Sequence, residues 1–292
     1  MNFKKILVPL DQSELAERAL TPALHIAEGM SAEIVLLHVV VPLELDLVLY
    51  ESSLRHGEEM AEAYLAFIRT RFVDAQPDMT AKVIVSSVVP TAVINYAQGS
   101  DVDLIVMSSH GRSGLSRWRY GSVAAKVLRQ APCAMLVIPA ETETELFTFG
   151  RILVPLDGSE MAEQALEPAM AIARAAAAEL VLLRVVALPY IAVEFLSTER
   201  NIEQIEAEAS REASAYLQHL KESLAGEHHI LIRTETIIGP AADAISDYVN
   251  ENNVDIIVMS SHGRSGILLW TYGSVAEKVL LGTDCATMII RH

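Results

Sequence analysis

Ten residues, IVMSSHGRSG, occur twice in this chain, at 105–114 and again at 257–266. Three further segments recur in the same order: ILVPLD at 6–11 and 152–157, VLLHVV at 35–40 and VLLRVV at 181–186, and GSVAAKVL at 121–128 and GSVAEKVL at 273–280. Repetition of whole segments in one order indicates a duplicated domain. The chain has 292 residues, which is long for one core and suits two. We therefore predict a domain at 1–140, a linker at 141–150 and a second domain at 151–292.

Short apolar runs alternate with helical patterns in each half. In the first half, the apolar runs predict strands at Ile6–Leu10, Ile34–Val40, Lys82–Ser86, Leu104–Met107 and Met135–Ile138. The first helical pattern, Ser13–Glu28, is expected to end at Gly29, because glycine is common just after a helix. Strands separated by helices pair in parallel, since the helix returns the chain to the starting edge of the sheet. The sequence thus predicts an α/β fold with two tandem, doubly wound parallel sheets, each covered on both faces.

The repeated ten residues end an apolar run in small and polar residues. Nine residues after Gly111 and after Gly263 comes a Gly-Ser pair, Gly121-Ser122 and Gly273-Ser274, followed by a helical pattern. A buried strand, a glycine loop and the start of a helix together form an anion site, because main-chain N–H groups and the helix dipole favour negative charge.

An aspartate closes the first predicted strand of each half, Asp11 and Asp157. Loops that leave the carboxyl ends of parallel strands lie at one edge of the sheet, and ligands bind there where the strand order reverses. If the first and fourth strands are neighbours, each aspartate faces the glycine loop of its own half across one cleft. The spacing of the residues does not itself give the strand order.

A net charge of −16 argues against nucleic acid and anionic lipid as partners, because both are bound by clustered cations. A single nucleotide is compatible with this charge, since local main-chain amides decide its affinity. No apolar run approaches the roughly 18 residues that cross a bilayer. The amino terminus runs straight into a strand pattern without a secretory layout, so we expect a cytoplasmic protein.

Catalytic and metal motifs are not recognised in the chain. It has no P-loop, no strict Gly-x-Gly-x-x-Gly after the first strand, and no nucleophile with an adjacent base. We predict no catalytic residue and no metal site. Cys133 and Cys285 each precede an apolar run and are predicted to be buried free thiols.

These motifs resemble the universal stress proteins, in the form with two domains in tandem, over almost the whole chain. Nucleotide-binding members of that family carry Gly-x-x-Gly, nine residues, then Gly-Ser or Gly-Thr; here Ser108 and Ser260 stand in place of the first glycine. The resemblance implies an adenine nucleotide alpha hydrolase-like fold with strand order 3-2-1-4-5. It also implies an intrachain pseudo-dimer in which the two domains pair through their fifth strands. Whether two chains form a homodimer is left open.

The resemblance further implies an adenine nucleotide as ligand, ATP, ADP or AMP, with or without Mg²⁺. In the first half it assigns binding to Pro9, Leu10, Asp11, Val39, Met107, Ser108, His110, Gly111, Arg112, Gly121, Ser122 and Val123. In the second half it assigns binding to Pro155, Leu156, Asp157, Val185, Gly239, Met259, Ser260, His262, Gly263, Arg264, Gly273, Ser274 and Val275. The aspartate and valine would hold adenine, and main-chain amides of the loop would hold ribose and phosphates. The second half, with Gly239-Pro240 and Asp157-Gly158, matches the family better than the first.

Structural explanations compete with this assignment. Asp11 and Asp157 stand three residues before a glutamate, and Ser274 stands three before Glu277, a spacing that caps helices. The histidines of the two loops would either bind phosphate or brace the loop, and Trp118 and Trp270 would act as packing anchors. Three alternative functions remain: a ligand-free dimerisation and interaction scaffold, a slow ATP hydrolase or adenylyl-transferring enzyme, and a flavin domain.

Overall fold

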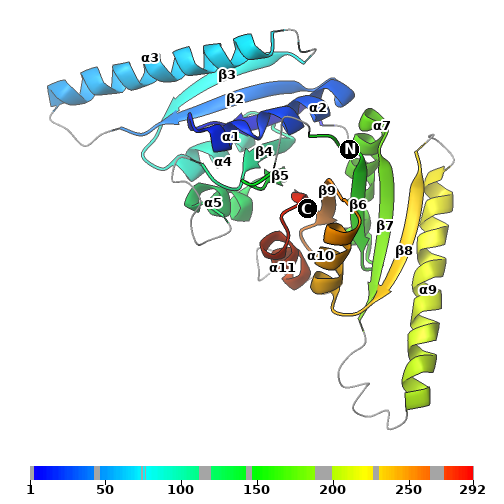
Figure 1. The fold of residues 1–292 in the computed structure, drawn as a ribbon. Helices are drawn as coiled ribbons and strands as arrows, with labels where there is room; N and C mark the ends of the chain where they lie inside the picture. Colours follow the sequence, from blue (N-terminus) through cyan, green and yellow to red (C-terminus); the bar gives the residue numbers. More distant parts are fainter. Residues whose placement is uncertain are drawn as a thin grey trace. The chain divides into compact units, whose positions relative to one another are not determined.

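The computed structural model describes residues 3–42, 47–73, 75, 77–111, 120–142, 147–187, 199–225, 230–263 and 273–291 (Figure 1). The chain separates into two compact units that divide between Thr148 and Phe149. We describe each unit by itself.

The first unit contains five strands and five helices within the described residues. In chain order they are β1 (Lys5–Pro9), α1 (Glu14–Glu17), α2 (Leu20–Met30), β2 (Glu33–Val40), α3 (Leu47–Arg71), β3 (Met79–Val85), α4 (Val89–Gly99), β4 (Leu104–Ser108), α5 (Ser122–Gln130) and β5 (Ala134–Ile138). The strand order is β3-β2-β1-β4-β5, and all four pairings are parallel. The α/β fold predicted from the sequence and the strand order implied by the family resemblance are confirmed.

The second unit repeats this arrangement. Its elements are β6 (Arg151–Leu156), α6 (Glu160–Glu163), α7 (Leu166–Ala176), β7 (Glu179–Val186), α9 (Glu199–Ala225), β8 (Ile232–Ile238), α10 (Ala241–Glu251), β9 (Ile256–Ser260), α11 (Ser274–Gly282) and β10 (Ala286–Ile290). The strand order is β8-β7-β6-β9-β10, with parallel pairing throughout.

The first and fourth strands of each unit are neighbours, which the cleft hypothesis required. Ile6 pairs with Leu104 in the first unit, and Ile152 pairs with Ile256 in the second. All four side chains are fully buried, as expected for strands with helices on both faces. Burial of each such side chain contributes about 1.5–3 kcal/mol, so the sheet is anchored at the position from which the site loops leave.

The helix predicted at Ser13–Glu28 is wrong in two respects. It is two helices, α1 and α2, and α2 continues through Gly29 to Met30. Pro22 lies in the first turn of α2, where its missing N–H is tolerated; in one continuous helix its ring would clash with the carbonyl of Arg18. The left-handed position that ends α2 is occupied by Ser31, with φ 54°, rather than by glycine.

Both cysteines are free and each directly precedes the last strand of its unit. Cys285 is buried as predicted, whereas Cys133 is only partly buried. Burial raises the pKa of each thiol to about 12.

We expect these thiols to resist alkylation, because only the thiolate is a nucleophile. At pH 8, Cys285 in the folded protein should react with iodoacetamide at least roughly 100-fold more slowly than an unperturbed thiol with a pKa near 8.5. Mass spectrometry of timed samples measures the rate, and urea-unfolded protein is the control. Equal rates in folded and unfolded protein would contradict the burial of Cys285.

No helix within the described parts of the chain is long and apolar enough to cross a membrane.

Candidate functional site

Each unit has a cavity of about 290 Å³ at the carboxyl edge of its sheet. The first cavity is lined by every residue that the sequence assigned to that half except Arg112, which lies outside the described residues. The second is lined by every assigned residue except Arg264, also outside the described residues, and Gly239, which is not part of the lining. Gly239 instead precedes Pro240, the N-cap of α10. The structure thus brings the remaining assigned residues of each half together in one cavity.

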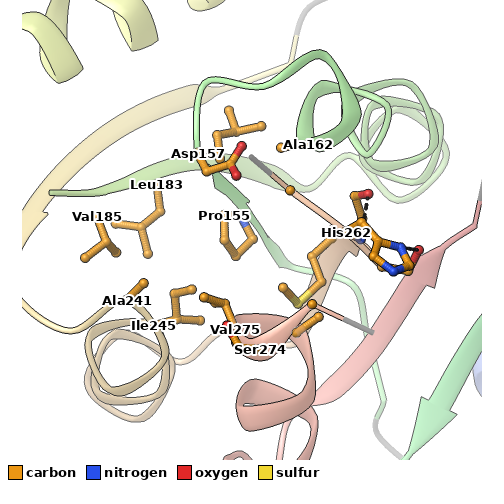
Figure 2. Close-up of a pocket in the computed structure, with 17 residues that line it drawn as sticks. Pro155, Asp157, Ala162, Leu183, Val185, Ala241, Ile245, His262, Ser274 and Val275 are labelled. Atoms are coloured by element: carbon orange, nitrogen blue, oxygen red, sulfur yellow. Dashed lines mark hydrogen bonds between the residues drawn. The ribbon is translucent and has the colours of Figure 1, made fainter. Parts of the chain in front are cut away.

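One end of each cavity is apolar. Figure 2 shows Leu183, Val185 and Ile245 grouped at this end of the second cavity, with His262 at the other. The matching residues of the first cavity are Leu37, Val39 and Val93. Of these residues, sequence reasoning named only Val39 and Val185.

Two signals could have found the missing wall residues. Leu37 and Val39 are two apart on one strand and therefore share a face of the sheet. Val89 and Val93 are four apart on α4 and share one side of the helix. Both pairs line the cavity.

The aspartate of each cavity is held by a serine two residues further on. Asp11 Oδ1 accepts hydrogen bonds from Ser13 N at 3.1 Å and Ser13 Oγ at 2.5 Å. Ser13 Oγ in turn accepts from Ala16 N at 3.1 Å, so Ser13 is the N-cap of α1. The same chain runs from Asp157 through Ser159 to Ala162. The aspartates therefore do not cap the helices directly, and that structural explanation is wrong.

The aspartates closely approach the glycine loops. A Cβ added at Gly111 would lie 2.3 Å from Asp11 Oδ2, and one added at Gly263 would lie 2.3 Å from Asp157 Oδ2. No real Cβ makes a contact that short, so the two segments can meet only because the loop residue is glycine.

The serine that replaces the first glycine of the family motif braces the loop. Ser108 Oγ accepts a hydrogen bond from His110 N at 3.4 Å, and Ser260 Oγ accepts one from His262 N at 3.3 Å. The hydroxyl thus turns the chain back as it leaves the strand.

The imidazoles of the loops also have partners within the loop. His110 Nδ1 lies 3.1 Å from Ser109 Oγ, and His262 Nδ1 lies 3.1 Å from Ser261 Oγ. Of the two roles left open for these histidines, this contact supports bracing.

The far end of each loop is fixed at the start of a helix. Gly121 N donates to Ser109 O at 2.8 Å, and Gly273 N donates to Ser261 O at 2.8 Å. These two amides are therefore used within the protein rather than offered to a ligand. Gly121 and Gly273 are the N-caps, so Ser122 and Ser274 are the first helical residues, as the sequence predicted, and Ser274 is not a cap.

The first-turn amides of α5 and α11 have no acceptor within their own helices. Ser122, Val123 and Ala124 line the first cavity, and Ser274, Val275 and Ala276 line the second. Each cavity therefore combines an apolar end, a carboxylate and the positive end of a helix dipole.

Trp118 and Trp270 lie outside the described residues. Among the side chains that the structure describes, no group of three His, Cys, Asp or Glu residues is placed to hold a metal ion.

Comparison with known proteins agrees with this architecture. Residues 2–139 and 148–291 each match the universal stress protein family. The universal stress protein YxiE of Bacillus subtilis is 32% identical over 150 residues, which cover 49% of this chain and 99% of that protein. A universal stress protein of Mycobacterium tuberculosis strain H37Rv is 26% identical over 222 residues, 75% of this chain and 71% of that protein.

A solved structure shares the fold over the full length. The crystal structure of a universal stress protein from Archaeoglobus fulgidus aligns with a TM-score of 0.75 and 21% identity, covering 100% of this chain and 99% of that one. Two matches to the family, together spanning nearly the whole sequence, establish that this chain belongs to the universal stress protein family and carries its domain twice in tandem.

Proposed function

We propose that both cavities bind an adenine nucleotide and that the protein acts as a nucleotide-responsive regulatory module. One observation carries the proposal: a single cavity holds an apolar end for a flat base, a carboxylate that accepts hydrogen bonds, and a helix N-terminus suited to phosphate. The cavity volume of about 290 Å³ is at the lower end of the roughly 300–1,000 Å³ typical of small-molecule sites.

The residues present fit such a ligand. Asp157 and Val185 would hold the base, and the first-turn amides of α11 would receive phosphate oxygens. A Cβ at Gly273 would meet only Ser261 O at 3.5 Å and His262 Cα at 3.7 Å, so the glycine leaves room that a side chain would fill. Mg²⁺ would be brought in with the phosphates.

Ligand binding should appear as a gain in thermal stability. ATP, ADP or AMP at 100 times its dissociation constant is expected to stabilise the folded protein by about 2.7 kcal/mol, since only the folded state binds it. Differential scanning fluorimetry with and without Mg²⁺ measures the shift, with guanine nucleotides as the control for base specificity. Mass analysis of small molecules released from denatured protein identifies any ligand that co-purifies. No shift at millimolar nucleotide, with no released ligand, would support the interaction scaffold instead.

Whether the protein also hydrolyses ATP is a separate question. Turnover by the wild-type protein that is lost when the cleft is blocked would show hydrolysis at this site. Four further points stay predictions: the domain limits at 140 and 150, the pairing of the domains through their fifth strands, the cytoplasmic location and homodimer formation.

A further inference from the structure

An arginine lies behind the Asp157 loop, on the face of the sheet opposite the cavity. Arg184 stands in β7 between Leu183 and Val185, which line the cavity, so its side chain points to the other face. There its guanidinium carbon lies 5.6 Å from the centre of the Tyr216 ring of α9. Its Nη1 lies 3.5 Å from Leu156 O, the last carbonyl before Asp157.

Gly158 is matched to this arginine. Its φ of 79° lies in the left-handed region, and a Cβ there would be 2.8 Å from Arg184 Nη1. Glycine thus lets the guanidinium pack directly on the main chain of the loop. On the same side, Tyr216 Oη donates to Glu163 Oε1 at 2.8 Å, which ties α9 to the helix that follows the loop.

These contacts shift the pKa of Tyr216. Burial and the adjacent Glu163 raise the pKa of Tyr216, with a smaller contribution from Asp157, while Arg184 opposes the rise. The arginine therefore places a positive charge among two carboxylates and a half-buried phenol.

The first unit differs at both matched positions. Its strand carries His38 where the second carries Arg184, and its loop carries Gln12, with φ 68°, where the second carries Gly158. His38 is 4% exposed and meets the Tyr64 ring edge-on, with 6.3 Å between centroids. The arginine near Tyr64 in the first unit is Arg71, which lies at the end of α3 and pairs with Glu17. At the strand position of Arg184 the first unit therefore has an imidazole, on a shorter side chain than that of arginine.

We propose that Gly158 and Arg184 form a clamp on the Asp157 loop that makes the second cleft bind nucleotide more tightly than the first. This inference rests on the proposed function. Arg184 does not reach the cavity, so it is a positioning residue: its planar guanidinium fixes the main chain on either side of Asp157 before the ligand arrives. A loop that is already ordered loses less conformational freedom on binding, and a difference of about tenfold in affinity is expected.

Proteins with one working cleft test the difference. Gly111→Val disables the first cleft and Gly263→Val disables the second, because each added Cβ collides with its aspartate. Isothermal titration with ADP on these full-length proteins should give about tenfold tighter binding when the second cleft is the working one. Circular dichroism and urea unfolding confirm that each variant is folded.

A transplant separates positioning from general support of the fold. In the Gly111→Val protein, only the second cleft binds. There Gly158→Gln should weaken binding, because the glutamine side chain meets Arg184. Adding Arg184→His should then raise the affinity to that of the first cleft. Within Gly263→Val, the reciprocal pair Gln12→Gly and His38→Arg should tighten the first cleft by about tenfold, a gain that a merely structural role would not produce.

The outcomes are distinguishable. Equal affinities in the two clefts, or no change of affinity on exchanging the pairs, would overturn the clamp while leaving nucleotide binding in place. If the wild-type protein binds no nucleotide, both proposals fail, although urea unfolding still shows whether Gly158 and Arg184 are energetically coupled.

Discussion

The Gly263→Val protein is expected to bind nucleotide at one cleft only, with affinity at the second reduced by at least about 100-fold, equivalent to roughly 2.7 kcal/mol. The added Cβ would lie 2.3 Å from Asp157 Oδ2, so the carboxylate must move. It cannot move freely, because its other oxygen accepts two hydrogen bonds from Ser159, at 3.0 Å and 2.6 Å. Titration calorimetry should show the stoichiometry fall from two nucleotides per chain to one.

A second glycine substitution serves as the control, and a third tests the cleft without a collision. Gly99→Ala, at the end of α4, adds a Cβ that meets nothing within 4 Å, so both clefts should keep their affinity. Gly273→Ala makes only ordinary contacts within the protein but replaces a glycine N-cap by alanine, so it should cost the empty protein at most about 1 kcal/mol and should weaken binding at the second cleft. A stoichiometry of two in Gly263→Val would contradict the proposed position of the ligand.

The Asp157→Ala protein is expected to lose both stability and nucleotide binding in its second unit. Removing an ionised acceptor of two hydrogen bonds should destabilise this unit by about 2 kcal/mol, because hydrogen bonds to charged groups contribute roughly 1.5–3 kcal/mol each and water replaces part of the loss. Urea unfolding measures the stability, and calorimetry measures the binding.

Asp157→Asn separates the two effects. Asparagine keeps an oxygen that can accept from Ser159 but loses the second carboxylate oxygen, which faces Gly263. We expect nearly wild-type stability and weak binding. Asp247→Ala, an exposed position on α10, is the matched control and should change neither. Wild-type affinity in Asp157→Asn would show that the aspartate serves only the loop.

The repeated segments made the division into two α/β domains predictable, because whole segments recur in one order, whereas the strand order within each sheet was implied by the family resemblance. The start of a helix at Ser122 was also predictable, since Gly-Ser preceded a clear helical pattern. Backbone conformation was not. Nothing in the periodicity shows that Gln12 adopts a φ of 68°, and this turn is what makes Ser13, rather than Asp11, the cap of α1.

The contacts behind the loops were equally beyond the sequence. The exchange of His38 for Arg184 is visible when the two halves are aligned, but its meaning depends on Tyr216 and Gly158. These residues come from a strand, a long helix and a turn, and only the folded unit brings them within contact. Sequence patterns identify residues on one helix or strand more readily than residues from different elements that are in contact in the folded structure.

The close approach of Asp157 to Gly263 joins the beginning of a unit to a point near its end. A molecule seated against both would act as a reversible cross-link over most of that unit's length. Fragments that stop before β9 would keep the Asp157 side of the binding surface and would lack the glycine loop and the start of α11. A bound ligand would therefore stabilise only the complete unit and would oppose local unfolding that begins at either end of it.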